Sequence, residues 1–509
     1  MSEIKKAFSK TDVAVSFSAA NLLYLRVWQE LIFAGTERSF YLITPNSLSY
    51  TVAFINVFLI GMVIWAAHFY YRYSGSKTME RGLALILLFS FLLPLNALRL
   101  LFPQLSISNL VDILGELGFG LLIIFLVGTL IRIGFRFSKG AVKTAGVIYL
   151  ILFPFIFFTF IQAGWALAAG IEEAKEPDRP EPTPEDKRPA ERVVWFVFDE
   201  LDQRLTFEER PEGMEIPELK SLKEKGFYAS AAYPPAEDTI LSMPAFTSGK
   251  MIAEAEVKNK EELLLSPEKS EEEIPWSEAP NVFVEARKMG ARSGMTGCFL
   301  PYCRVIGHTL DRSSWQPFGT VKLNREKGLT EAMAEQVLAP FTISPFNYRS
   351  HAMLLHKELQ AKAKDLVADP ELDLVLVHWS IPHYPWIYSR AREDFSRLNY
   401  NLETGYFDNL ALVDRSLRKM RRKMEENDLW DRTHVIISSD HPWRMELVPT
   451  YDGEQDPRIP FILRVAGEEE SVHYSSPFNT VLSKDLILAL LAGEISSPAG
   501  VAEWLEKNK

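Results

Sequence analysis

The chain has 509 residues, with 66 Asp and Glu against 55 Lys and Arg, and a formal net charge of −11 at pH 7. This acidic balance argues against a nucleic-acid partner, because surfaces that bind nucleic acids are basic. The composition also changes along the chain, since long apolar runs dominate only the first third. We therefore expect more than one folded unit.

The apolar runs predict an integral membrane unit over residues 1–171. Four runs reach the roughly 20 residues that a helix needs to cross a bilayer core, at about 48–72, 82–102, 110–132 and 144–170. A fifth run, at about 13–35, is interrupted by Arg26 and Glu30, whose spacing would let them pair on one helix face. This run could span the bilayer or lie along its surface, and we favour a span. The prediction is four or five spans.

Basic residues in the short loops predict the orientation of these spans, because Lys and Arg there favour the cytoplasmic side. The loops after 48–72 and 110–132 are basic, whereas 103–109 has neither Lys nor Arg; the basic residues are Arg72, Lys77, Arg81, Arg132, Arg136, Lys139 and Lys143. With both basic loops in the cytoplasm, everything after about residue 171 lies outside it. We expect a multi-pass protein of the cytoplasmic (inner) membrane with an extracytoplasmic C-terminal domain.

Residues 172–191 are rich in proline and charge, which predicts a stiff, solvated linker. Residues 192–509 are enough for one large domain with a substantial core. Buried strands are expected at Val193–Phe198, Leu374–His378, His434–Ser439 and Pro460–Val465, and helices at Tyr406–Glu425 and Ser483–Leu491. This alternation predicts an α/β fold, with a central, mostly parallel sheet covered by helices on both faces.

Both cysteines of the chain, Cys298 and Cys303, fall in this domain. In an oxidising compartment we expect them to form a short-loop disulfide, with free thiols as the alternative. A zinc site built on these two cysteines alone is not expected, because structural zinc needs four ligands.

Polar residues stand at the ends of three predicted strands. Asp199 and Glu200 follow the first, His378 ends the second, and Asp440 and His441 follow the third. Ligands of such sheets bind beyond the carboxyl ends of the strands, so these residues should converge. Carboxylates suit Mg²⁺, Mn²⁺ or Ca²⁺ and accept Zn²⁺, and an added imidazole favours Zn²⁺ or Mn²⁺. Each alone could be a solvated loop residue, but together they predict a divalent metal site.

Thr239 precedes Ser242 and Pro244 where a helix is expected to begin after a loop. A hydroxyl at this position can face both a metal and the amides of the helix N-terminus, and a threonine activated in this way is a nucleophile. The alternative is that Thr239 is only the N-cap of the helix.

The order of these motifs resembles the alkaline phosphatase superfamily, specifically its membrane-anchored sulfatase-like branch, which includes lipoteichoic acid synthases and lipid A phosphoethanolamine transferases. The resemblance covers about 192–495. It implies that Asp199 is the first metal ligand with Glu200 as a possible second, that Thr239 is the nucleophile, and that Asp440 and His441 are the late ligand pair. It also implies one divalent metal ion, for which we favour Zn²⁺ or Mn²⁺ over Mg²⁺ or Ca²⁺.

The segment from His378 to Pro385 resembles the family's histidine segment that contacts the transferred group. His383 is the preferred catalytic candidate and His378 the second, either of which could protonate a leaving group. The alternative for His383 is a loop histidine between prolines. The implied reaction is attack by Thr239 on a phosphodiester, and the implied substrate is a membrane lipid or a cell-envelope glycan at the outer membrane face.

Two departures from the family pattern limit the function. Ser242 is followed by Pro244 but not by the arginine that formylglycine sulfatases need, which disfavours a sulfate-ester hydrolase. Pro442 replaces the glycine that often follows the Asp-His pair, and Arg444 beyond it could hold a phosphate by a bidentate contact. Arg444 and Ser242 are the candidates for substrate binding.

Two other classes of function are weaker alternatives. An inactive relative that acts as a membrane scaffold should lack metal ligands, yet the expected ligand positions are retained. A transporter should carry ionisable residues inside several spans, yet few are present.

Overall fold

The computed structural model describes residues 8–32, 36–42, 45–92, 94–95, 107–168, 188–270, 272–317, 328–339, 346–397, 402–444 and 456–509. The chain folds into two units, one made of residues 1–35, 43–173 and 319–347 and the other of 36–42, 174–318 and 348–509. Most of the expected linker at 172–191 lies outside the described residues. Its last part already belongs to the second unit, because Arg188 Nη2 lies 2.6 Å from Asp373 Oδ1.

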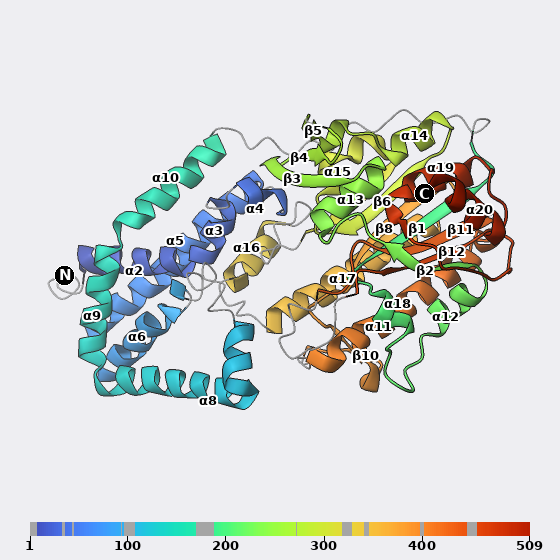
Figure 1. Cartoon of the computed structure of the whole chain (residues 1–509). Helices are drawn as coiled ribbons and strands as arrows, with labels where there is room; N and C mark the ends of the chain where they lie inside the picture. Colours follow the sequence, from blue (N-terminus) through green and yellow to red (C-terminus); the bar gives the residue numbers. More distant parts are fainter. Residues whose placement is uncertain are drawn as a thin grey trace. The chain divides into compact units, whose positions relative to one another are not determined.

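The first unit is helical in its described part (Figure 1). Its helices are α2 (Lys10–Leu23), α3 (Leu25–Leu31), α5 (Ser47–Ser74), α6 (Lys77–Phe89), α8 (Ile107–Arg136), α9 (Ser138–Ile151), α10 (Pro154–Ala168) and α16 (Leu329–Leu338). Within the described residues, Ser47–Ser74 and Gly118–Arg136 are long and apolar enough to cross a membrane, and α9 with α10, bent by 45°, would make a third span if the pair is one.

The expected run at 13–35 is not one continuous helix. The chain breaks at Tyr24, so that α2 has 14 residues and α3 has 7, and each is shorter than a bilayer core requires. Arg26 and Glu30 do pair within α3, at 2.8 Å between Nη2 and Oε1. The run at 82–102 begins within α6, which ends at Phe89, and its residues 93 and 96–102 lie outside the described part. The count of four or five spans stays a prediction.

Helix α5 is bounded by ordinary capping chemistry. Asn46 Oδ1 accepts a hydrogen bond from Ser49 N at 2.9 Å at its start, and Gly75 ends it with a left-handed φ of 59°. Helix α16, although it comes from the C-terminal half of the sequence, packs on α5. Gln336 Nε2 donates to Ser49 O at 2.8 Å and Asn56 Nδ2 donates to Met333 O at 3.1 Å, which explains why this segment belongs to the first unit.

The second unit is built on a sheet of order β13-β2-β12-β11-β1-β8-β6-β7, with β14 paired to β2. Strand β12 is antiparallel to both of its neighbours, and the other pairings are parallel. The strands are β1 (Arg192–Asp199), β2 (Phe227–Tyr233), β6 (Ser293–Cys298), β7 (Arg312–Gln316), β8 (Leu374–Pro382), β11 (Thr433–Ser439), β12 (Ile459–Arg464), β13 (Val472–Tyr474) and β14 (Phe478–Asn479). Small sheets are formed by β3 (Ile252–Asn259), β4 (Glu262–Pro267) and β5 (Ile274–Pro275), and by β9 (Tyr388–Ser389) with β10 (Asp394–Phe395).

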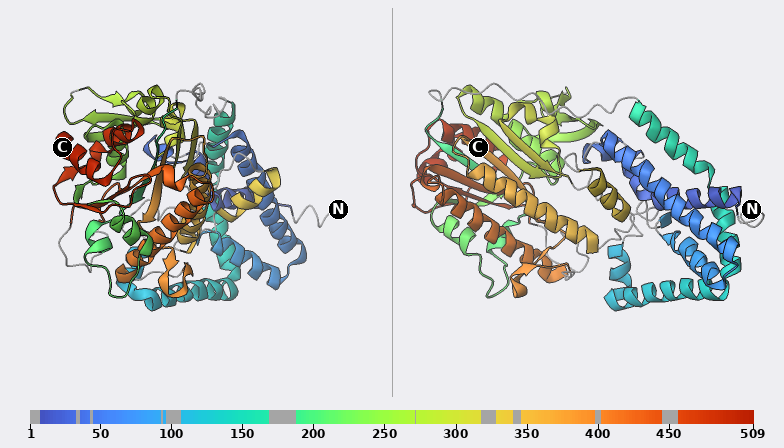
Figure 2. Two further views of the ribbon diagram at one scale, coloured as in Figure 1. Left: turned by 90° about the vertical axis from the view of Figure 1, so that its right-hand side faces the viewer. Right: turned by 180° about the vertical axis from the view of Figure 1, so that it is seen from behind.

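Helices cover both faces of the main sheet (Figures 1 and 2). The described α-helices of this unit are α4 (Thr36–Phe40), α11 (Gln203–Phe207), α12 (Pro217–Glu224), α13 (Thr239–Ser248), α14 (Val282–Lys288), α15 (Tyr302–Val305), α17 (Phe346–Val367), α18 (Leu402–Glu425), α19 (Ser483–Leu491) and α20 (Pro498–Asn508). Side chains alternate along β1, so Trp195 packs with α13, α14 and α19 in one core, whereas Phe196 packs with α12, α17 and α18 in the other. The predicted α/β sheet covered on both faces is confirmed.

The α4 segment, residues 36–42, is part of the second unit even though it precedes α5 in the chain. Phe40 is fully buried in the core that contains Trp195, and the ring of Tyr41 stacks on that of Phe299 with centroids 4.8 Å apart. Arg304 Nη2 donates to Leu42 O at 2.7 Å. The sequence patterns did not predict this placement.

Candidate active site

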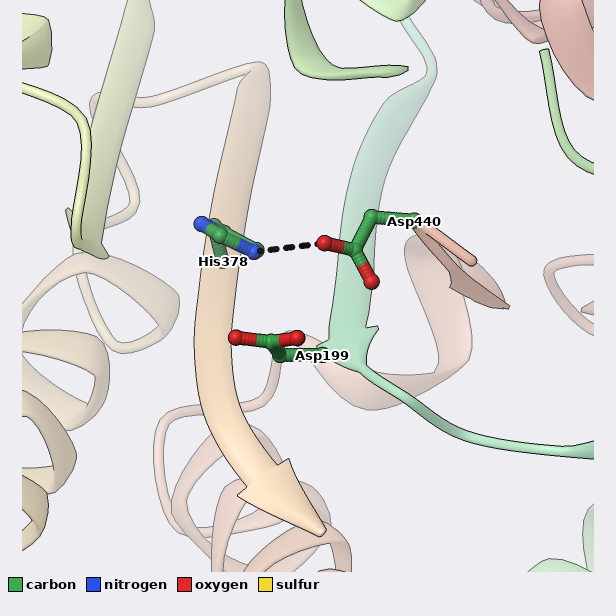
Figure 3. A group of neighbouring side chains, drawn as sticks. All are labelled: Asp199, His378 and Asp440. Carbon is green, nitrogen blue, oxygen red and sulfur yellow. Dashed lines mark ion pairs between the residues drawn. The ribbon is translucent and has the colours of Figure 1, made fainter. Parts of the chain in front are cut away.

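Strands β11, β1 and β8 are neighbours and parallel, so their carboxyl ends meet at one edge of the sheet. This brings together Asp199, His378 and Asp440, as Figure 3 shows, with one ligand atom from each within 4.8 Å of the others. All three side chains are buried. The convergence expected from the sequence is therefore present in the structure.

Two polar atoms of this group lack hydrogen-bond partners. Asp199 Oδ1 and His378 Nε2 are buried and make no hydrogen bond, and each such atom costs roughly 1–3 kcal/mol when left unsatisfied. His441 Nε2 lies 3.5 Å from Asp199 Oδ1 and 3.6 Å from Asp440 Oδ2, and His378 Nε2 lies 3.6 Å from the same Asp440 oxygen. Tetrahedral ligands about 2.1 Å from a zinc ion are separated by about 3.4 Å. The donor set therefore fits a divalent cation such as Zn²⁺ or Mn²⁺.

Asp440 is held in place from several sides. Its Oδ1 accepts hydrogen bonds from His441 N at 2.9 Å and Glu200 N at 3.3 Å. Burial alone would raise the pKa of Asp440, but the positive charge of His441 and the hydrogen bond from Thr239 lower it below the usual range. Burial raises the pKa of Asp199. The two carboxyls are thus in different electrostatic environments.

Thr239 is the first residue of α13 and points at the carboxylate of Asp440. Its Oγ1 donates to Asp440 Oδ2 at 2.6 Å and lies 3.4 Å from His441 Nε2. The N-cap position is occupied by Asp238, so the alternative role of Thr239 as N-cap does not hold. Ser242 is fully buried, and its hydroxyl donates to Ala236 O at 3.1 Å, which ties down the preceding loop. This contact points to a structural role and away from the substrate binding we expected.

Glu200 is not one of the three residues of this group. Its backbone is left-handed, with a φ of 66°, and its Oε1 accepts a hydrogen bond from Arg444 Nε at 2.9 Å. Arg444 also lies against Asp238, with Nη1 to Oδ1 at 2.9 Å, and against His383, with Nη2 to Nε2 at 3.2 Å. Glu200, expected as a possible second metal ligand, thus lies outside the group of three. Arg444, expected to bind phosphate, is paired with two carboxylates.

His383 is a partly exposed histidine next to this group. Its side chain is 21 % exposed, and its Nε2 is 3.8 Å from Glu200 Oε1. Burial tends to lower the pKa of His383, but the charges of Asp199 and Glu200 raise it overall. Asn409 Nδ2 donates to His383 O at 3.2 Å and so fixes the loop to α18.

His378 is held by a residue that the sequence patterns did not single out. Its Nδ1 lies 2.8 Å from the hydroxyl of Tyr302, which is fully buried at the start of α15. This contact aims Nε2 at Asp440, so the geometry groups His378 with the candidate ligands instead of the proton donors. Tyr302 follows β6, and the pairing of β6 with β8 brings it close to His378. Because the sequence of β6 shows no clear strand pattern, this proximity could not be predicted.

The expected disulfide is not formed. Cys298 is buried, Cys303 is half-buried, and no disulfide bond joins them. Cys298 is buried at the end of β6, where its Sγ lies 3.8 Å from the carbonyl oxygen of His378, and burial raises the pKa of this thiol. Cys303 lies on α15, beyond the turn that places Tyr302.

No family model and no curated protein matches the chain. Solved structures do match. Ps i-CgsB, in complex with k-i-k-neocarrahexaose, is 15% identical with a TM-score of 0.43 over 61% of this chain and 74% of that chain. The lipoteichoic acid synthase LtaP from Listeria monocytogenes is 13% identical with a TM-score of 0.40 over 61% and 75%. A protein in the alkaline phosphatase superfamily from Vibrio parahaemolyticus is 13% identical with a TM-score of 0.39 over 64% and 74%.

The resemblance to the alkaline phosphatase superfamily rests on the order of the sequence motifs. With identities of 15% or less and TM-scores of 0.43 or less, the matched structures establish neither a family nor an activity for this chain. What the protein does has to be argued from its own side chains.

Proposed function

We propose that the protein is a metal-dependent phosphoryl-transfer enzyme with Thr239 as its nucleophile. The observation that carries the proposal is the 2.6 Å hydrogen bond from Thr239 Oγ1 to Asp440 Oδ2, because this carboxylate belongs to the buried group in which Asp199 Oδ1 and His378 Nε2 have no hydrogen-bond partner among the described residues. A hydroxyl at the first residue of a helix, against a candidate metal centre, is suited to attack an anionic ester.

Asp199, His378, Asp440 and His441 would hold the metal ion. When bound, the metal would draw charge from a phosphoryl oxygen and make the threonine hydroxyl more acidic. The residues supply position: Asp440 orients the Thr239 hydroxyl, and the backbone bonds around Asp440 keep its carboxylate fixed.

The reaction follows from these positions. Thr239 Oγ1 forms a bond to phosphorus as its proton leaves along the hydrogen bond to Asp440 Oδ2, and the bond from phosphorus to the leaving oxygen breaks. His383, the solvent-facing histidine of the site, gives its proton to that oxygen. Water or an acceptor hydroxyl then attacks the phosphorus of this threonine ester and gives its proton to His383, while the bond to Oγ1 breaks and Asp440 returns the proton to that oxygen.

The substrate we propose is a phosphodiester of a lipid head group or an envelope glycan, presented at the outer membrane face. The membrane assignment is supported by the two long apolar helices of the first unit. Phosphate is preferred over sulfate because Thr239 stands at the nucleophile position and no arginine follows Pro244 in the pattern of formylglycine sulfatases.

Turnover of aryl esters by the purified full chain tests this proposal. Bis(p-nitrophenyl) phosphate should be hydrolysed, and Thr239→Ala should reduce kcat by about 10³-fold or more because the nucleophile is lost. Thr239→Ser keeps a hydroxyl and should retain part of the rate. Mass spectrometry of the trapped enzyme should show a p-nitrophenyl phosphoryl group on Thr239. A Thr239→Ala variant with unchanged turnover, or preference for p-nitrophenyl sulfate, would contradict the proposal.

A further inference from the structure

A second concave site lies in the C-terminal unit, and its lining includes none of the candidate active-site residues. The cavity has a volume of about 620 Å³ and is lined by the loop before α12, the segment from Tyr388 to Glu393, and one face of α18. Pockets of roughly 300–1,000 Å³ are typical of ligand sites. We refer to it as the basic groove, for the reason given next.

One face of α18 gives the groove its charge. Arg415, Arg418, Lys419 and Arg422 all line it. Their spacing of three, four and seven residues places them on the same side of the helix. Seven residues of α-helix rise about 10 Å, so the row of cations is elongated. Such a row stands out in a chain with a net charge of −11.

The carboxylates nearby do not neutralise the row. Asp414 is buried, and its Oδ1 accepts hydrogen bonds from Glu218 N at 2.8 Å and Leu219 N at 2.9 Å, the first turn of α12. Its other oxygen pairs with Arg418 at 3.2 Å. Glu215 and Glu393 also line the groove, and both are solvent-exposed. Asp414 therefore accepts hydrogen bonds from the first turn of α12 and forms an ion pair with only one arginine of the row, Arg418.

The remaining cations contact neutral groups. Arg415 Nη1 donates to Tyr388 Oη at 3.2 Å and to a backbone carbonyl, that of Glu393, at 3.4 Å. Lys419 Nζ donates to the amide oxygen of Gln360 at 2.8 Å. Among the described residues, no carboxylate lies within ion-pair distance of Arg415, Lys419 or Arg422.

This arrangement is unfavourable without an anion. Arg415 with Lys419 and Arg418 with Arg422 are like charges four residues apart, and such pairs destabilise a helix. Burial lowers the pKa of Lys419, and the positive charge of Arg415 lowers it further. An anion bound in the groove would reduce the repulsion between these like charges and would stabilise the charged form of Lys419.

We propose that the basic groove binds an elongated ligand that carries at least two tetrahedral oxyanion groups, either phosphate or sulfate esters. Guanidinium groups match such oxyanions with paired hydrogen bonds, and a row about 10 Å long exceeds the reach of one ion. The proposal goes beyond the proposed function and does not depend on catalysis by Thr239.

Calorimetry on the full chain in detergent tests it, in the Thr239→Ala form to exclude turnover. Tripolyphosphate and sucrose octasulfate are the two probes, and whichever binds more tightly identifies phosphate or sulfate as the preferred group. In either case the affinity should fall at least tenfold in Arg415→Gln/Arg422→Gln. Binding should persist in chelator, which removes any contribution from the metal centre, and inorganic phosphate should bind at least tenfold more weakly than tripolyphosphate.

The matched control is Lys220→Gln/Lys423→Gln, which removes the same charge from α12 and α18 outside the groove lining. This pair should change the affinity less than twofold. Equal weakening by both pairs would reduce the effect to general electrostatics and overturn the proposal. The proposal would also be overturned if neither tripolyphosphate nor sucrose octasulfate bound. Equal affinity for inorganic phosphate and tripolyphosphate would overturn it as well.

Discussion

At the scale of single residues, the candidate metal centre depends on how His378 is oriented. Its imidazole has one nitrogen toward Asp440 and the other 2.8 Å from Tyr302 Oη. Partners of this kind fix the ring and the tautomer of a ligating histidine. Tyr302 is therefore a positioning residue for the candidate centre.

Tyr302→Phe removes the hydroxyl and keeps the ring in its buried place. We expect the affinity for Zn²⁺ or Mn²⁺ to fall by about 10- to 100-fold, measured by competition with a chelating dye. Tyr474→Phe is the control, because its hydroxyl contacts Glu506 on α20. If both variants keep the wild-type affinity, Tyr302 has no role in positioning His378.

Gly297 allows the close approach of these two side chains. A Cβ at this position would lie 2.6 Å from Tyr302 Cε2 and 3.1 Å from His378 Cβ. We expect Gly297→Ala to lower the free energy of unfolding by about 1–3 kcal/mol, because the overpacked ring must shift. Denaturant unfolding measures this. Gly500→Ala is the control, since its Cβ would meet only ordinary contacts at 3.4 Å or more, and an unchanged stability in Gly297→Ala would contradict the packing argument.

At the scale of secondary structure, the strands found from sequence are the ones that form the site. Strands β1, β8 and β11 were predicted because runs of apolar residues rich in valine and isoleucine reveal a strand buried on both faces. Strand β6 was missed because Ser293–Cys298 contains two glycines and no Val or Ile, and one of these glycines, Gly297, leaves room for the ring of Tyr302. The contacts of Tyr302, Glu200 and Arg444 could likewise not be predicted from the sequence and are known only from the structure.

Helix α17 carries a buried histidine that should make stability depend on pH. His356 is fully buried between the rings of Trp379 and Phe395, and this burial lowers its pKa to about 3. The pKa of an unfolded histidine is about 6.5. As the pH falls, His356 is therefore protonated at a higher pH in the unfolded chain than in the folded chain. The stability present above pH 6.5 is lost progressively as the pH falls toward 3.

The expected loss from His356 is up to about 1.4 kcal/mol for each pH unit below 6.5. Chemical unfolding of the full chain in detergent between pH 7 and pH 4.5 measures it. His356→Gln should flatten this part of the profile relative to the wild type. His473→Gln changes an exposed histidine and should leave the slope unaltered. Parallel profiles for the wild type and His356→Gln would contradict the assignment.

At the scale of the whole molecule, the candidate metal centre joins strands that are distant in sequence. Asp199, His378 and Asp440 come from three neighbouring strands of the sheet. A cation there would therefore stabilise the folded second unit by mass action, by about 2.7 kcal/mol at a metal concentration 100 times Kd.

Chelation should thus lower the thermal unfolding midpoint of the full chain by several degrees, and Zn²⁺ or Mn²⁺ should restore it. Asp199→Asn should unfold at the same temperature with and without chelator, because a ligand is missing. Thr239→Ala is the control that loses activity but keeps the four candidate ligands, and it should still respond to metal. A wild-type midpoint that ignores both chelator and added metal would contradict the metal centre.

The way the two units share the sequence has a consequence for how such a protein can evolve. Residues 36–42 belong to the second unit, and 319–347 belong to the first. A single crossover between genes could not deliver either unit intact, because the chain passes from one to the other more than once. A chain that kept only the C-terminal part would need a new side chain to fill the space of Phe40.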